Sequence, residues 1–120
     1  MVTVIIPVYN RPDDLRRALS SLTAQTRSDF KVIIADDAST ENVDAVVDEF
    51  ARLDITMLKS TVNRGCGANR TLALNYFLTE APTDFVMFLD SDDLLYPHAI
   101  ERLTELITHN EADLIITNIH

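Results

Sequence analysis

The stretch Phe85-Val86-Met87-Phe88-Leu89-Asp90-Ser91-Asp92-Asp93 decides the fold. Its first five residues are apolar and fit a buried strand. Three carboxylates follow within four residues, at the carboxyl end of that predicted strand. In open α/β sheets, ligands bind in the crevice outside the carboxyl ends of the strands. The stretch therefore predicts a sheet of this kind with a polar site at its edge.

The three acids, Asp90, Asp92 and Asp93, repel one another unless a positive charge neutralises them. Mg²⁺ or Mn²⁺ would do so through oxygen ligands and would leave coordination positions for phosphate oxygens. The alternative is a helix start, because Asp is favoured at N-caps and Pro97 could occupy the first helical position of the next segment. Capping needs one acid rather than three, so the sequence favours metal or phosphate chemistry.

The rest of the chain alternates between apolar runs and segments with helical periodicity. Strands are predicted over residues 2–8, 30–35, 55–58, 85–89 and 114–116. Helices are predicted to begin near Arg11, near Asn42, after Gly67 and before Ile100. The side chains expected to face inward are Leu15, Leu19 and Leu22 in the first helix and Val43, Val46, Val47 and Phe50 in the second. In the third helix they are Leu72, Ala73, Tyr76 and Phe77, and in the fourth Ile100, Leu103 and Ile107. This order predicts an α/β fold with a doubly wound, mostly parallel, Rossmann-like sheet and helices on both faces.

In such a sheet, the segments after the first, second and fourth strands open on one edge. These segments are residues 7–10, 36–39 and 90–93, and they are expected to converge at one crevice. Asp36 and Asp37 have two open interpretations. They could complement the dipole of the helix near Asn42, or accept a hydrogen bond from the ring N–H of uracil, thymine or guanine. Tyr9 could lie against the face of such a base or be a half-buried aromatic residue.

The loop over residues 63–70 holds both glycines of the chain, with Arg64 and Arg70. Glycine lets the backbone approach a ligand, and arginine can hold phosphate with two hydrogen bonds. For Arg70, phosphate contact and solvated surface charge stay equally open, whereas surface charge is favoured for Arg64. The third glycine of a dinucleotide fingerprint is missing, so that motif is set aside.

Composition limits the class of protein. The 120 residues carry 19 acidic and 10 basic side chains, for a formal net charge of −9, which disfavours nucleic acid and anionic lipid as partners. The length fits one domain. No signal peptide or apolar stretch of roughly 20 residues is present, so no membrane segment is expected. The single cysteine, Cys66, is compatible with a cytoplasmic location, and attachment to the inner face of a membrane would need residues outside the chain.

Five motifs, in this order, resemble family 2 glycosyltransferases of the GT-A fold. They are Val4-Ile5-Ile6-Pro7-Val8-Tyr9-Asn10, Ser20-Ser21-Leu22-Thr23-Ala24-Gln25-Thr26, Val32-Ile33-Ile34-Ala35-Asp36-Asp37-Ala38-Ser39-Thr40, Asn63-Arg64-Gly65 with Ala68-Asn69-Arg70, and Phe88-Leu89-Asp90-Ser91-Asp92-Asp93. Each motif is weak alone, but together they cover nearly the whole chain at compatible spacing. Two positions depart from the pattern, with Ala38 where glycine is usual and Thr71 where asparagine is expected.

The resemblance implies a nucleotide-sugar donor, usually a uridine diphosphate sugar, bound at the strand ends. By position, Tyr9 would contact the base, Asp37 would accept its ring N–H, and Arg70 would lie near the nucleotide or its phosphates. The expected nucleotide site also includes Pro7, Asn10, Asp36, Asp90 and Ser91.

The resemblance also implies Mn²⁺ or Mg²⁺. Asp90-Ser91-Asp92 matches the Asp-x-Asp motif, in which Asp92 would bind the metal directly and Asp90 would approach the ribose and the metal shell. Asp93 could share the metal. The expected reaction is transfer of the sugar to an acceptor hydroxyl of a glycan or another molecule, with inversion at the anomeric carbon.

The resemblance places the acceptor-binding half and its general base beyond His120. Residues 1–120 are therefore expected to be the nucleotide-sugar-binding portion of a larger GT-A domain, which alone would bind donor weakly and transfer little or nothing. The alternative is a non-catalytic module that binds nucleotide sugars. A truncated sheet could also expose apolar surface and pair two copies as a homodimer.

Overall fold

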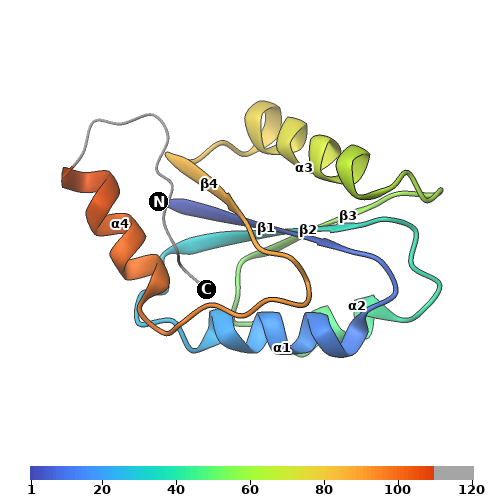
Figure 1. Ribbon diagram of the computed structural model, residues 1–120, viewed down its shortest axis with the longest axis horizontal. Coiled ribbons are helices and arrows are strands. Elements are labelled where there is room, and N and C mark those ends of the chain that lie inside the picture. Colours follow the sequence, from blue (N-terminus) through green and yellow to red (C-terminus); the bar gives the residue numbers. More distant parts are fainter. Residues whose placement is uncertain (110–120) are drawn as a thin grey trace.

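A computed structural model describes residues 1–109, in which strands and helices alternate along the chain (Figure 1). The elements are β1 (Val2–Val8), α1 (Pro12–Thr23), β2 (Phe30–Asp36), α2 (Val43–Asp48), β3 (Ile55–Lys59), α3 (Cys66–Glu80), β4 (Phe85–Phe88) and α4 (Ala99–His109). The strand predicted over residues 114–116 lies outside the described residues.

The described strands form one parallel sheet in the order β3-β2-β1-β4. Strand β1 lies in the middle, between β2 and β4, and each crossover between neighbouring parallel strands contains a helix. The predicted α/β class and the parallel sheet are thus confirmed. The apolar runs without polar alternation indicated this arrangement, because a parallel sheet is covered on both faces.

Helices cover both faces of the sheet. In Figure 1, α3 lies above the sheet, α1 and α2 lie below it, and α4 lies beside it. Val4 and Ile6 of β1 belong to a core with the buried side chains of α1, α2 and α4, whereas Ile5 packs with Ala73 and Phe77 of α3. Alternate residues of one strand therefore serve two separate cores, as the period of two in a strand requires.

Helix α3 presents a different stripe from the one predicted. Its buried residues are Asn69, Ala73 and Phe77, which are spaced by four and share one face. Leu72 was expected to face inward, but it is 39% exposed, so that expectation was wrong. Leu72 precedes Ala73 by one residue, and this turns its side chain about 100° away from the buried stripe. Tyr76 is partly buried and packs against the core on this face.

The boundaries of the elements differ slightly from those predicted. Strands β2 and β3 each run one residue further than expected, and β4 ends one residue earlier, at Phe88. Helix α3 includes Cys66 and Gly67, which were expected in the preceding loop. These shifts leave the polar segments at the carboxyl ends of the strands.

The strands do not end at the same height. Val8, the last residue of β1, lies opposite Asp36, the last residue of β2, but Phe88 at the end of β4 lies opposite Ile5. The backbone N–H of Leu89 still donates to the carbonyl of Ile5 at 2.9 Å, and the chain then leaves the sheet. Strand β1 continues for three more residues, a rise of about 10 Å. The carboxyl edge of the sheet is therefore stepped, with its lower level at β4.

Candidate functional site

A pocket of about 570 Å³ opens at this stepped edge. Of the residues expected to bind the nucleotide or the metal, those that line it are Pro7, Tyr9, Asp37, Arg70, Asp90, Ser91 and Asp92. These residues come from the ends of β1, β2 and β4 and from α3. The structure therefore brings together the polar segments that the sequence predicted to converge.

Three expected site residues, Asn10, Asp36 and Asp93, are not among the residues that line the pocket. The side-chain oxygen of Asn10 accepts hydrogen bonds from the backbone N–H groups of Thr40 at 2.7 Å and Glu41 at 3.0 Å. Asp36 accepts from the backbone N–H of Ser39 at 3.1 Å. Asn10 and Asp36 thus shape the loop after β2, which begins with the lining residue Asp37.

Asp37 is 3% exposed, and both of its carboxylate oxygens accept backbone hydrogen bonds. One oxygen binds the N–H of Arg64 at 2.8 Å and the other binds the N–H of Gly65 at 2.9 Å. Gly65 precedes α3 with a φ of 90°, a conformation that glycine adopts at little cost. Asp37 therefore fixes the loop that enters α3 and, with it, one wall of the pocket.

The hydrogen bonds of Asp36 and Asp37 go to groups other than the helix near Asn42. Asn42 itself caps α2, because its side chain accepts from the backbone N–H of Ala45 at 3.1 Å. Asp36 serves a turn, and Asp37 serves the loop before α3. The sequence could not distinguish these partners, because the loop over residues 63–65 lies far from Asp37 along the chain.

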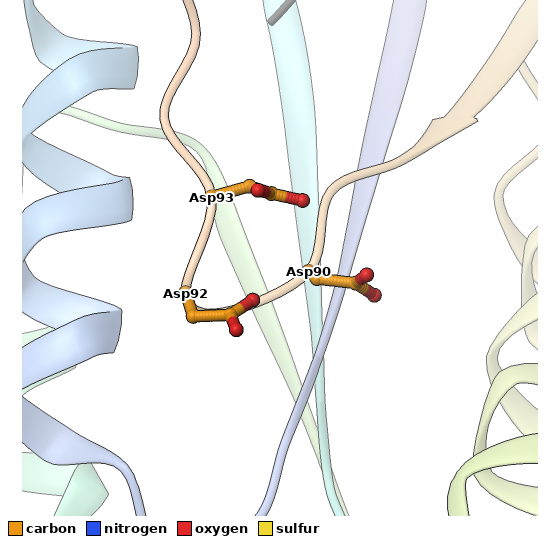
Figure 2. Close-up of side chains that lie close together, drawn as sticks. All are labelled: Asp90, Asp92 and Asp93. Carbon is orange, nitrogen blue, oxygen red and sulfur yellow. The ribbon is translucent and has the colours of Figure 1, made fainter.

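The carboxylates of Asp90, Asp92 and Asp93 lie close together after β4. Each offers one oxygen, and these oxygens lie within 4.8 Å of one another. Figure 2 shows the three side chains on one short loop, extending to the same side of it. The backbone N–H of Asp93 donates to the carbonyl of Asp90 at 2.9 Å, which keeps this loop tight. A cluster with only oxygen donors fits Mg²⁺ or Mn²⁺.

The helix-start interpretation of these acids was wrong. Helix α4 begins at Ala99, six residues after Asp93, and Pro97 precedes it rather than occupying its first position. The intervening segment is held instead by Gln25, which follows α1. Gln25 donates to the carbonyl of Tyr96 at 2.8 Å and accepts from the backbone N–H of Ile100 at 3.1 Å.

Arg70 reaches across the pocket to the acidic loop. Its Nη2 donates to Oδ1 of Asp90, and the two side chains are each partly exposed. Its Nε is buried and has no hydrogen-bond partner within residues 1–109. A buried donor without a partner costs free energy, so this nitrogen is suited to an acceptor that a ligand would bring.

Asn69 is the most informative residue that the sequence did not assign to the site. It lines the pocket, is 2% exposed, and donates from Nδ2 to the carbonyl of Ala35 at 2.8 Å. Its Oδ1 has no partner in the described part of the chain. One signal was present, because Asn69 is the polar member of the stripe that includes Ala73 and Phe77. The other lining residues that the sequence did not assign are Val8, Arg11, Asn63, Gly65 and Cys66.

Tyr9 is half-buried, as one of its two interpretations expected. Its side chain is 47% exposed, and it lies at the upper level of the pocket at the end of β1. About half of the side chain is thus accessible at the pocket. Within residues 1–109, no helix is long and apolar enough to cross a membrane.

Comparison with known proteins identifies the family of this chain. Residues 3–120 match the model of the family described as glycosyl transferase family 2. Among relatives, the poly(ribitol-phosphate) β-N-acetylglucosaminyltransferase TarP of Staphylococcus aureus is 35% identical over 119 residues, which cover 96% of this chain and 35% of TarP.

Solved structures show the same fold. TarS of S. aureus (residues 1–349, in complex with UDP-GlcNAc) is 29% identical, with a TM-score of 0.81 over 89% of this chain and 31% of TarS. The mannosyltransferase PcManGT of Pyrobaculum calidifontis, in complex with GDP-Man and Mn²⁺, is 29% identical, with a TM-score of 0.69 over 85% of this chain and 32% of that protein. The chain thus spans about one third of each of these proteins. It belongs to glycosyl transferase family 2.

Proposed function

We propose that this chain binds a uridine diphosphate sugar together with Mn²⁺ or Mg²⁺, for transfer of the sugar to an acceptor hydroxyl. The observation that carries the proposal is the meeting of an acidic cluster, an arginine and a buried carboxylate in one pocket at the carboxyl edge of the sheet. The complex of TarS with UDP-GlcNAc supports the choice of donor, and the Mn²⁺ complex of PcManGT supports the choice of ion.

The metal would be held by Asp92 and Asp90, with Asp93 beside them. These three residues supply oxygen ligands that lie within 4.8 Å of one another. The ion, when bound, would neutralise the charge that develops on the departing nucleoside diphosphate. Ser91 lies between Asp90 and Asp92 in the sequence and is buried, so the loop packs against the protein at this residue.

The base would be recognised at the upper level of the pocket, by Tyr9 and Asp37. Although both oxygens of Asp37 accept a backbone N–H, each carboxylate oxygen has a second lone pair. A ring N–H of uracil can use one of these, and Tyr9 can lie against the ring face. N3-methyl-UDP tests this role, because it has no ring N–H and should bind much more weakly than UDP.

We also propose that the reaction inverts the anomeric carbon. TarP is named as a β-N-acetylglucosaminyltransferase, and a β product is what a single displacement gives from an α-linked nucleotide sugar. Such a displacement needs a general base for the acceptor hydroxyl. Of the acids that line the pocket, Asp37 accepts from backbone N–H groups, Asp90 pairs with Arg70, and Asp92 is assigned to the metal. We therefore assign the base and the acceptor site to residues outside these 120.

Calorimetric titration of the purified protein with UDP, TDP and GDP, each with and without Mn²⁺, tests the proposal. We expect Mn²⁺-dependent binding of UDP that Asp92→Ala abolishes. Asp48→Ala is the matched control, because it removes the same charge from the exposed end of α2 and should bind like the wild type. Binding of GDP in place of UDP would show that the donor is wrong, and binding of none of the three would refute the nucleotide site.

A further inference from the structure

We propose that Arg70 and the divalent ion compete for the carboxylate of Asp90, so that the ion and the diphosphate bind as a coupled pair. This inference rests on the proposed function and adds to it a role for one residue. Arg70 holds Asp90 in the absence of ligands and turns to the phosphates when the diphosphate enters, so that Asp90 is left to the ion.

The evidence begins with the pairing itself. Arg70 comes from α3 and Asp90 from the loop after β4, and the two side chains meet across the pocket through Nη2 and Oδ1. Asp90 also belongs to the acidic cluster, where its carboxylate lies within 4.8 Å of the ligand oxygens of Asp92 and Asp93. One carboxylate is thus shared between a guanidinium group and the predicted metal site.

Charge makes this sharing unfavourable for a metal that arrives alone. With no ion bound, the guanidinium offsets part of the negative charge that the three acids place on one short loop. A divalent ion at the cluster brings two positive charges next to the guanidinium, and the two cations repel each other. The ion by itself should therefore bind more weakly than the acidic cluster alone would allow.

A diphosphate removes this conflict. Arg70 has a second donor, Nε, which is buried and without a partner among the residues described, and which a phosphate can reach once the side chain turns away from Asp90. Phosphate oxygens accept charge-assisted hydrogen bonds from a guanidinium group, often two at once. When the diphosphate enters, Arg70 can exchange Asp90 for phosphate, and Asp90 is left to the ion. Each ligand thus favours the other, and thermodynamic linkage makes the two effects equal.

The test measures Mn²⁺ affinity by electron paramagnetic resonance, which follows the sharp spectrum of the free ion, with and without saturating UDP. In Arg70→Met, we expect Mn²⁺ alone to bind about threefold tighter or better than in the wild type, because the repelling charge is gone. We expect the factor by which UDP strengthens Mn²⁺ binding to fall by about tenfold. Arg70→Lys keeps the charge without the planar fork, so Mn²⁺ alone should bind as in the wild type while the coupling falls.

Arg102→Met is the control, since it removes an exposed arginine on α4 outside the pocket and should leave both quantities unchanged. Thermal unfolding confirms that each variant is folded. If Arg70→Met binds Mn²⁺ alone no tighter than the wild type, the competition is refuted, although UDP and Mn²⁺ still bind together. If the wild-type protein binds no UDP even with Mn²⁺, the proposed function fails and this inference fails with it.

Discussion

Asn10 Oδ1 accepts a hydrogen bond from the backbone N–H of Thr40 at 2.7 Å, across 30 residues of sequence. This bond ties the end of β1 to the loop after β2. In return, the backbone N–H of Asn10 donates to Ser39 Oγ at 2.8 Å. The segments that follow β1 and β2 are therefore joined by polar contacts next to the pocket residues Tyr9 and Asp37.

Replacing Asn10 with alanine should lower the free energy of unfolding by about 2 kcal/mol, because two backbone N–H groups lose their acceptor. Asn10 also has a φ of 50°, which asparagine tolerates better than alanine. Urea unfolding measures the change. Asn10→Asp keeps the acceptor and the tolerance, so it should lose less than about 1 kcal/mol. Equal losses for the two variants would show that the hydrogen bonds contribute little.

Ala38→Gly should stabilise the protein by about 0.5 kcal/mol. Ala38 has a φ of 64°, where a Cβ costs about 1–2 kcal/mol, and glycine removes this strain at an entropic cost of about 0.5–1 kcal/mol. The same urea experiment measures the gain. Ala45→Gly is the matched control, since Ala45 lies within α2 and glycine there should cost about 1 kcal/mol. A loss of stability in Ala38→Gly would show that the positive φ of Ala38 does not strain the backbone.

Asn69→Ala should cost about 1–3 kcal/mol, because the buried carbonyl of Ala35 would lose its donor. The loss should appear in thermal or urea unfolding without ligand. Asn75→Ala serves as the control on the same helix, where the side chain is exposed and the change should be within about 0.5 kcal/mol. Similar losses of stability for the two variants would show that the hydrogen bond between Asn69 and Ala35 contributes little to the stability of the protein.

The rate at which the Cys66 thiol is modified should show whether a ligand occupies the pocket. Cys66 is exposed, lines the pocket and is the single cysteine of the chain, so N-ethylmaleimide should modify this residue alone. With Mn²⁺ and UDP at about ten times its dissociation constant, the rate of modification should fall about tenfold, because only the free protein reacts. Mass spectrometry follows the reaction. Adenosine at the same concentration is the control, and an unchanged rate with UDP would place the nucleotide elsewhere.

The contact between α1 and α2 should depend on pH. Arg16 donates to both carboxylate oxygens of Glu49, and these hydrogen bonds lower the pKa of Glu49 below its ordinary value of 4.5. Because the pKa is lower in the folded state, the pair stabilises the protein fully above pH 4.5. This contribution is lost as the pH falls through the folded-state pKa.

A double-mutant cycle with Arg16→Met and Glu49→Gln measures the interaction at several pH values. The coupling energy should be present near neutral pH and should disappear in acid. It should also weaken in high salt, because both side chains are partly exposed. A coupling energy that stayed constant from neutral to acidic pH would show that the carboxylate charge is not its source.

The general position of the site could be predicted from the sequence because it depends on strand order alone. Apolar runs followed at once by acids place Asp37 and Asp90 at strand ends, and parallel strands bring those ends to one edge. No knowledge of side-chain contacts was needed for this step. The same argument gave the helices on both faces, since a parallel sheet must be covered twice.

The partners of individual side chains could not be predicted in this way. Asp37 binds the loop before α3, and Asn10 binds the loop after β2, through contacts that depend on the three-dimensional path of each loop. Leu72 and Asn69 show the same limit within a helix. Hydrophobicity favoured Leu72 as the buried residue, whereas the rotation of α3 buries Asn69 and gives it the carbonyl of Ala35 as an acceptor.

Because β1 and β4 end at different heights, the spacing between the two levels of the pocket is fixed by the sheet. The distance between the level of Asp37 and the level of Asp90 is set by the pairing of Ile5 with Phe88 in the backbone. Changing a side chain in the pocket can alter which groups a ligand meets, but it cannot alter this spacing. A ligand that spans both levels must therefore match a length that the sheet itself has fixed.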